Sequence, residues 1–303
     1  MKTYFHTQPG LVVVYGCIQE NVVHRHNAIQ LVWPESAASL TVDDTPCEAA
    51  AVIDSRIPHQ LTMDQGWILL IEPHSALGHA LAARLAGRPY MALDEVPFYQ
   101  GSLSTLDATL DDPEPAFDVL SKMLAPILSA LGVLRLFEQL LLQHLSMVDV
   151  TDLERAGIEM TGRDVAVSQV VLSETSQRYT VFDSARLDKR VQAALVYLQQ
   201  FFSSSASRPF EDKLLVDAVA KSVGLSKSRF LHVFREQMGI TWRSYVLWRR
   251  LLSAIRQIRQ GSNATQAAHN AGFADSAHLS RTFKATFGLT IRDANQQWGA
   301  RKY

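Results

Sequence analysis

The chain has 303 residues, of which 47% are hydrophobic and 19% charged, with a formal net charge of -1. This balance is ordinary for a folded protein, argues against long disordered tracts, and leaves room for more than one domain. Two cysteines, Cys17 and Cys47, are too few for a disulfide scaffold, and the first ten residues do not resemble a secretory signal. We therefore expect a cytoplasmic protein.

The small net charge conceals a strong asymmetry between the two parts of the chain. Residues 186–303 carry 19 basic and 7 acidic side chains, whereas residues 1–185 carry 10 basic and 23 acidic ones. A basic region attracts polyanions through counterion release, and an acidic region repels them. The C-terminal part is therefore expected to face nucleic acid, and the N-terminal part to face something else.

Short apolar runs separated by turn-prone residues predict a small β-barrel or sandwich near the N-terminus. The runs lie at residues 11–18, 28–33, 49–53 and 67–71. Turns are predicted between them at residues 34–36, 43–46 and 64–66.

Three histidines of this region have a spacing suited to a shared site. His24 and His26 alternate along the chain, so a strand places both on one face, and His59 is near the end of a later strand. Together with Gln30 they resemble the His-x-His and distant His of the cupin barrel family. Gln30 stands near the position where metal-binding cupins have a Glu, and the glycines around the cupin motifs are missing.

Two interpretations of these histidines stay open, namely ligands of a transition metal and polar lining of the barrel. We expect an effector site for a small molecule, with no metal and no cofactor. Its residues are His24, His26, Gln30 and His59.

The middle of the chain predicts helices. His74 and His79 are expected at the surface, beside a helix over residues 76–86, and residues 90–115 are expected to form a loop. Apolar periodicity then predicts helices over residues 116–131 and 133–148. The second helix has a wide apolar stripe, and two interpretations of it stay open: the helix is buried in the core, or it forms part of a homodimer interface. Polar residues interrupt the run, so no membrane contact is expected.

One pattern occurs twice in the basic part, with a period of about 48 residues. The first copy contains Ala220, Gly224, Phe230, Phe234 and Gly239, and the second contains Ala268, Gly272, Leu279, Phe283 and Gly288. A small residue lets two helices pack closely, a glycine permits the turn between them, and the apolar residues hold the second helix on the core. The sequence thus predicts two helix-turn-helix units, joined by one long helix over residues 242–258.

Further residues of this region resemble the AraC/XylS family of transcriptional regulators. They include Arg235, Tyr245, Arg250, Ala254, Phe273, Asp275, Ser276, Ser280, Arg281, Lys284, Phe287, Leu289 and Thr290. The resemblance covers roughly the last 110 residues. It implies two helix-turn-helix units on a rigid helix, a cupin-like effector or dimerisation domain, and binding to double-stranded DNA at bacterial promoters. An unknown small-molecule effector, RNA polymerase and a second copy of the chain are the further partners that it implies.

We therefore expect an α+β fold with three regions. They are a cupin-like β-barrel over residues 1–105, a helical linker and dimerisation region over 106–182, and an all-α domain with two helix-turn-helix units over 186–303.

The inward-facing apolar residues of each second helix predict which side chains face DNA. These are Lys227, Ser228, Leu231, His232 and Arg235 in the first unit and Ser276, Ala277, Ser280, Arg281 and Lys284 in the second. Arg281 is the best candidate for a bidentate contact to guanine, whereas Leu231 and Ala277 can only touch thymine methyl groups. Lys227, at a helix N-terminus, is expected to contact phosphate.

Other arginines have simpler expected roles. Arg243, Arg249, Arg256 and Arg259 are expected to contact phosphate or to carry solvated charge. Arg250 is expected to pair internally, because the resemblance implies a structural role for it.

The leading function is sequence-specific regulation of transcription, in particular activation. Two alternatives stay open: a metal-dependent cupin enzyme fused to a DNA-binding domain, and an architectural protein that bends DNA without a ligand. The sequence has no Gly-rich phosphate loop, G-x-S-x-G elbow or Cys-x-x-Cys pair. We therefore expect no enzyme of another class.

Overall fold

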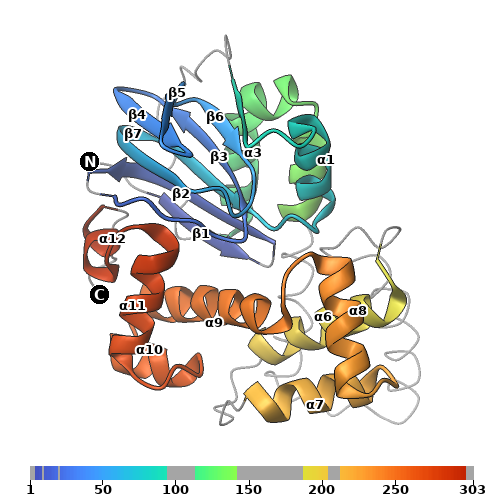
Figure 1. Cartoon of the computed structure of the whole chain (residues 1–303). Helices are drawn as coiled ribbons and strands as arrows, with labels where there is room; N and C mark the ends of the chain where they lie inside the picture. Colours follow the sequence, from blue (N-terminus) through green and yellow to red (C-terminus); the bar gives the residue numbers. More distant parts are fainter. Residues whose placement is uncertain are drawn as a thin grey trace.

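The computed structural model describes residues 4–8, 10–19, 21–93, 113–141, 187–203 and 212–297. An antiparallel sheet forms the N-terminal part, and most of the other described residues are helical (Figure 1). The strands are β1 (Tyr4–Gln8), β2 (Leu11–Ile18), β3 (Ile29–Pro34), β4 (Ala38–Val42), β5 (Thr45–Cys47), β6 (Ala51–Ile53), β7 (His59–Ile71) and β8 (Tyr90–Ala92). The α+β class and the N-terminal β domain predicted from the sequence are confirmed.

The long strand β7 organises the sheet. The main path runs β1-β2-β7-β3-β6-β8, while β4 pairs with the first part of β7 and β5 pairs with β4. β7 therefore has β2 on one side and both β3 and β4 on the other. In this register Leu69 lies opposite Val13 of β2 and opposite Leu31 of β3.

The two faces of the sheet bury different partners. Val13, Leu31 and Leu69 share a buried apolar cluster with α1 (Ala76–Leu85) and α3 (Pro113–Ala130). Alternate residues point the other way and share a second buried cluster with side chains of the C-terminal helices. Figure 1 accordingly shows α1 and α3 on one side of the sheet and α9 to α12 near the other.

Two predicted turns have different outcomes. Asp43 and Asp44 form the two-residue turn of the β4–β5 hairpin, with φ angles of 48° and 60°. The turn predicted at 64–66 is wrong, because these residues continue β7. Gly66 is needed there for close approach, since a Cβ would lie 2.7 Å from the Cα of Pro34.

The middle region is partly described. Residues 90–92 form β8, which pairs with β6, so the loop predicted over 90–115 is wrong at its start. It is wrong at its end too, because α3 begins at Pro113. Residues 134–141 are helical, and their apolar side chains belong to the core cluster on α3. That part of the stripe is therefore a buried core helix, whereas residues 142–186 lie outside the described residues.

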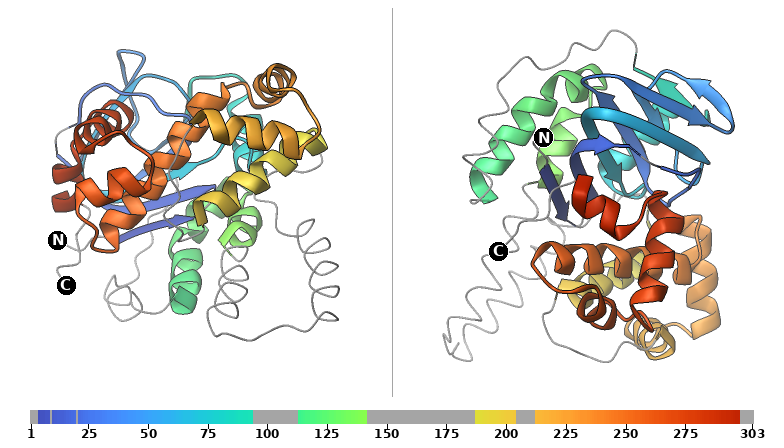
Figure 2. Two further views of the ribbon diagram at one scale, coloured as in Figure 1. Left: turned by 90° about the horizontal axis from the view of Figure 1, so that it is seen from below. Right: turned by 90° about the vertical axis from the view of Figure 1, so that its left-hand side faces the viewer.

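The C-terminal helices follow the predicted double motif. They are α6 (Lys189–Ser203), α7 (Asp212–Ser222), α8 (Lys227–Met238), α9 (Trp242–Arg259), α10 (Ala264–Asn270), α11 (Ser276–Phe287) and α12 (Ile291–Gln297). Figures 1 and 2 show α9 between two groups, with α10 to α12 at one end and α6 to α8 at the other. Over the described part of the chain, no helix combines the length and apolar character needed to cross a bilayer.

Candidate DNA-binding surface and effector site

The first helix-turn-helix consists of α7 and α8. Gly224, in the turn between them, has a φ of 68°, a conformation that side chains with a Cβ rarely adopt. Ser226 caps α8, because its hydroxyl accepts a hydrogen bond from the backbone N–H of Arg229 at 3.4 Å. The turn and the start of the second helix are therefore fixed by local chemistry.

Aromatic packing holds α8 against the start of α9. Phe230 and Phe234 are fully buried, and their ring centroids lie 5.0 Å and 5.1 Å from that of Trp242. Because these rings face inward, the opposite side of α8 faces outward.

The residues of α8 that the sequence predicts to contact DNA are exposed or half-buried: Lys227, Ser228, Leu231, His232 and Arg235. The ammonium of Lys227 lies 3.0 Å from a carboxylate oxygen of Asp217, with both side chains roughly half exposed. An exposed ion pair of this kind is weak, so Lys227 remains available to an incoming phosphate.

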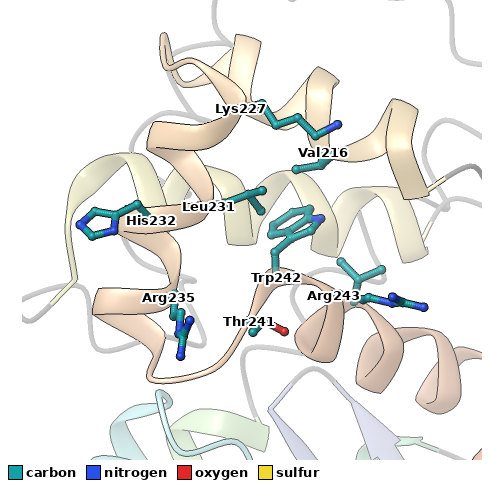
Figure 3. A pocket seen from close by; sticks show the side chains of 9 residues that line it. Val216, Lys227, Leu231, His232, Arg235, Thr241, Trp242 and Arg243 are labelled. Carbon is teal, nitrogen blue, oxygen red and sulfur yellow. The ribbon is translucent and has the colours of Figure 1, made fainter.

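A cleft of about 690 Å³ opens beside α8. It is lined by Val216, Lys227, Leu231, His232, Arg235, Thr241, Trp242, Arg243 and Val246. Figure 3 shows Trp242 between Lys227 on one side and Arg243 on the other. Cations that flank an apolar floor suit a sugar-phosphate backbone.

The second helix-turn-helix consists of α10 and α11 and repeats the same local chemistry. Gly272 in its turn has a φ of 81°. Asp275 caps α11, since its carboxylate accepts a hydrogen bond from the backbone N–H of His278 at 2.6 Å. Leu279, Phe283 and Phe287 are the buried side chains of α11.

The outward face of α11 carries the other predicted contacts. Ala277, Ser280, Arg281 and Lys284 are exposed, and Ser276 is half-buried. The hydroxyl of Ser280 donates to the carbonyl of Ser276 at 2.8 Å, which leaves its oxygen as an acceptor. Arg281 is therefore the strongest donor on this face toward a base edge.

The arginines of α9 divide into different roles. Arg250 is buried, donates to the carbonyl of Ala271 at 3.1 Å and lies over the ring of Phe273, so the predicted internal role is confirmed. Arg243 is exposed and lines the cleft beside α8.

The expectation that three further arginines contact phosphate or carry solvated charge is wrong. Arg249 is buried between the domains. Arg256 donates to the carbonyl of Phe202, and Arg259 lies over the ring of Phe5. Each of these three side chains contacts protein atoms outside α9.

Arg249 belongs to a buried polar group that joins α9 to the end of β7. One of its guanidinium nitrogens lies 3.8 Å from a carboxylate oxygen of Glu72 and donates to the hydroxyl of Tyr245 at 3.3 Å. Tyr245 in turn donates to the other carboxylate oxygen of Glu72 at 3.2 Å. Burial, and then the charge of Glu72, raise the pKa of Tyr245, so its hydroxyl keeps the proton that it donates.

Two more hydrogen bonds hold the end of α8. His74 donates to the carbonyl of Met238 at 2.8 Å, and Arg56 donates to the carbonyl of Gly239 at 3.1 Å. The prediction that His74 and His79 are surface residues is wrong, because both are half-buried beside this contact. These hydrogen bonds therefore connect the N-terminal domain to the end of the first helix-turn-helix.

A third contact holds the end of α11. The backbone N–H of Val22 donates to the carbonyl of Gly288 at 3.0 Å. Gly288 is buried with a φ of 73°, and a Cβ there would lie 1.9 Å from the side-chain oxygen of Asn21 and 2.6 Å from Nδ1 of His24. Both helix-turn-helix units are thus docked on the N-terminal domain.

The structure brings the three predicted histidines together beside that contact. His24 and His59 form an antiparallel bridge, with backbone hydrogen bonds of 3.0 Å and 2.9 Å. The ring centroids are 4.4 Å apart for His24 and His59 and 5.1 Å apart for His26 and His59. Gln30 completes the group, since its amide oxygen lies 2.9 Å from Nε2 of His26.

Burial keeps these imidazoles neutral. Desolvation, followed by the neighbouring imidazoles, lowers the pKa of His24 to about 3 and that of His26 to about 4. Desolvation also lowers the pKa of His59. Neutral imidazoles carry one proton each and offer one lone pair each, which suits a hydrogen-bonding ligand or a metal ion.

Sequence reasoning missed the residues that dock the two domains. Glu72 and Arg56 are isolated charges in the sequence, and only the fold places them against α8 and α9. The sequence offered one signal for this contact, namely the adjacent arginines Arg249 and Arg250. Adjacent residues of a helix face in different directions, so both side chains could not contact the same phosphates and at least one was expected to face protein.

Comparison with known proteins concerns mainly the C-terminal region. A family model described as a helix-turn-helix domain matches residues 219–297. The HTH-type transcriptional activator RhaS of Escherichia coli O139:H28 (strain E24377A / ETEC) is 32% identical over 110 residues, which cover 33% of this chain and 40% of RhaS. RhaS of Escherichia coli strain SE11 gives the same identity and coverage. The match thus spans 40% of the length of these relatives.

Solved structures give more distant similarity. ToxT from Vibrio cholerae O395 is 12% identical, with coverage of 94% of this chain and 97% of ToxT and a TM-score of 0.42. An AraC-type regulator from Chromobacterium violaceum is 22% identical, with coverage of 37% of this chain and 95% of that chain and a TM-score of 0.31. The sequence relatives are transcriptional activators, which does not favour the alternative of a cupin enzyme.

Proposed function

We propose that the chain is a sequence-specific DNA-binding regulator of transcription of the AraC/XylS type, in particular an activator. The match of residues 219–297 to a helix-turn-helix domain and the similarity to RhaS support this proposal. The observation that carries this proposal is the pair of second helices, α8 and α11, each with a buried apolar face and an exposed polar face. Such helices enter the major groove with their outward side chains. The chain acts by binding DNA rather than by catalysis.

The proposed DNA contacts are those of the two outward faces. They are Lys227, Ser228, Leu231, His232 and Arg235 on α8 and Ser276, Ala277, Ser280, Arg281 and Lys284 on α11. Arg243 joins them as a phosphate contact, because it is exposed in the cleft beside α8. With α9 as the rigid spacer, the two units read major grooves about one helical turn, or roughly 34 Å, apart.

We propose that the N-terminal domain senses an effector at the histidine cluster. His24, His26, Gln30 and His59 are buried, and His24 lies beside the contact between Val22 and Gly288. A ligand that moves these side chains therefore changes the docking of α11, and this provides a route from effector to DNA affinity.

We further propose that the chain divides at residues 1–105, 106–182 and 186–303, and that it forms a homodimer, contacts RNA polymerase and is located in the cytoplasm. The proposed dimerisation region is residues 106–182, of which the structure describes 113–141.

Selection of binding sites from random duplex DNA tests the function. The full chain is incubated with a random library at 150 mM salt, bound duplexes are amplified, and the enriched sites are footprinted. We expect one enriched motif with two half-sites about one helical turn apart. Recovery of DNA without an enriched motif indicates an architectural protein, and failure to retain duplex DNA at 50 mM salt contradicts the proposal.

A further inference from the structure

The three histidines share a feature that a general polar lining does not require. Nδ1 of His24 lies 2.9 Å from the carbonyl of Val22, Nδ1 of His26 lies 3.0 Å from the carbonyl of Ala28, and Nδ1 of His59 lies 2.8 Å from the carbonyl of Ile57. A carbonyl can only accept, so each Nδ1 carries the proton and each Nε2 presents its lone pair. Imidazoles that bind metal through one nitrogen commonly hold the other in this way.

One nitrogen from each of the three rings lies near the other two in the interior. The candidate ligand atoms of His24, His26 and His59 all lie within 4.8 Å of one another. Around a tetrahedral ion with bonds of about 2.0–2.1 Å, ligand nitrogens are about 3.3 Å apart. The separations in the structure exceed those around a bound ion by at most about 1.5 Å.

One of these nitrogens has no other role. Nε2 of His59 is buried and has no hydrogen-bond partner among the described residues, although buried polar atoms are nearly always paired. Nε2 of His26 is next to the amide of Gln30, which can turn its NH2 group toward that lone pair. An unpaired, buried acceptor on a ring that contacts two further neutral imidazoles is what a bound cation would satisfy.

We propose that His24, His26 and His59 bind one divalent first-row transition-metal ion, with zinc as the reference ion, and that this ion is the effector. Three neutral imidazoles favour zinc, copper, nickel or cobalt over magnesium and calcium, which require oxygen ligands. The fourth position is filled by water or an anion beside Gln30. Only the effector role of the ion rests on the proposed function, because metal binding itself does not require DNA.

The location of the cluster gives the ion a route to the DNA-binding domain. His24 follows Val22, whose N–H bonds Gly288 at the end of α11. The ring of His26 is 6.4 Å from that of Trp248, which is 6.1 Å from Phe287 in the last turn of α11. Drawing the imidazoles together therefore shifts the atoms against which the second recognition helix packs.

Metal titration of the full chain tests the site. The protein is stripped with a chelator, dialysed, and titrated with Zn²⁺ by calorimetry and with Co²⁺ by visible absorption. We expect one ion per chain, the strong visible bands of four-coordinate Co²⁺, and a higher melting temperature with Zn²⁺. The variants His24→Gln, His26→Gln and His59→Gln should each weaken Zn²⁺ binding at least tenfold, whereas His269→Gln, at an exposed position of α10, should not.

A gain of affinity makes the test sharper. Gln30→Glu has the same size but adds a carboxylate beside the site, so it should tighten Zn²⁺ binding at least fivefold. If a histidine variant fails to fold, this variant and the wild-type Co²⁺ spectrum still decide the question. No bound ion in the wild type, or equal affinity in all variants, overturns the metal site.

The effector role of the ion is tested separately, by its influence on DNA affinity. Affinity for the selected DNA site is measured by fluorescence anisotropy with and without one equivalent of Zn²⁺, and we expect a change of at least threefold that His59→Gln abolishes. Zn²⁺ binding without a change in DNA affinity overturns the effector role and leaves the metal site. Loss of specific DNA binding overturns the proposed function instead, while the calorimetric result stands.

Discussion

The carboxylate of Glu72, just after β7, lies 3.8 Å from the guanidinium of Arg249, in the middle of α9, and both side chains are almost completely buried. Both charges are largely shielded from water, so each is stabilised mainly by the other and by the hydroxyl of Tyr245. The helix that joins the two helix-turn-helix units is therefore fixed to the sheet by its own polar side chains.

Removing one member of this pair should unfold the interface. Glu72→Gln leaves the Arg249 charge buried without a counterion, and we expect a loss of about 3–5 kcal/mol in the free energy of unfolding, measured in urea. The double variant with Arg249→Met should lose less than the sum of the two single variants, because no charge remains buried.

An exposed pair provides the control for this prediction. His232 and Glu236 lie 3.9 Å apart on the surface of α8, and Glu236→Gln should change stability by less than about 0.5 kcal/mol. Equal effects at Glu72 and Glu236 would contradict the role given to the buried pair.

The features that the sequence predicted correctly are those fixed by local chemistry. Gly224 and Gly272 make the turns that the repeated pattern predicts, and each stands within a few residues of the helix that follows it. Because these signals act over one helical turn, their meaning does not depend on the rest of the fold.

The features that it missed depend on distant partners. Gly66 resembles a turn residue in the sequence, but it lies inside β7 because Pro34 passes too close for a Cβ. Arg249 resembles a phosphate contact, yet Glu72, far away in the sequence, decides its role. The rings of His24 and His26 lie together as predicted, 5.8 Å apart, but the strand that was expected to align them is only an isolated bridge at His24. The carbonyl groups that orient these rings could only be seen in the structure.

Two glycines that end the recognition helices provide a matched comparison. Gly239 and Gly288 both have positive φ, at 61° and 73°. A Cβ at Gly239 meets nothing within 4 Å, whereas a Cβ at Gly288 would lie 2.5 Å from the carbonyl oxygen of Val22. We expect Gly239→Ala to cost about 1–2 kcal/mol from backbone strain alone, and Gly288→Ala to cost at least about 2 kcal/mol more.

Denaturant unfolding of the two alanine variants measures this difference. Limited proteolysis should also cut Gly288→Ala faster in α11, since the contact with the N-terminal domain is displaced. If the two variants lose the same free energy, α11 is not docked against residues 21–24.

Arg281 is predicted to read a base rather than the backbone. Its side chain is exposed on the outward face of α11, and a bidentate contact to guanine contributes about 1–3 kcal/mol of discrimination. Arg281→Ala should therefore weaken binding to the selected site roughly 5- to 150-fold, with a much smaller loss on random duplex.

Arg292→Ala is the control for Arg281, since Arg292 is exposed on α12, outside the two recognition helices. Anisotropy titrations at a fixed salt concentration should give affinities within twofold of the wild type for this variant. An equal loss on both duplexes for Arg281→Ala would assign the residue to phosphate.

The hydrogen bond from His74 to Met238 predicts a dependence of stability on pH. Burial lowers the pKa of His74, the hydrogen bond to Met238 opposes the change, and His79 and the guanidinium of Arg56 add to it. The pKa is therefore lower in the folded state than in the unfolded state, where it is about 6.5. The stabilising contribution is complete above pH 6.5 and is lost as the pH falls below that value, because the unfolded chain then binds the proton more readily.

His74→Gln isolates this contribution, because the amide of Gln can still donate a hydrogen bond but does not titrate. Urea unfolding of wild type and variant at pH 7.5, 6.5 and 5.5, with a chelator present, should show that the wild type loses more stability than the variant as the pH falls. His269→Gln, at an exposed position of α10, should follow the wild-type curve. Parallel curves for His74→Gln and the wild type would mean that His74 is protonated as readily in the folded chain as in the unfolded one, and that the end of α8 is not held by a neutral imidazole.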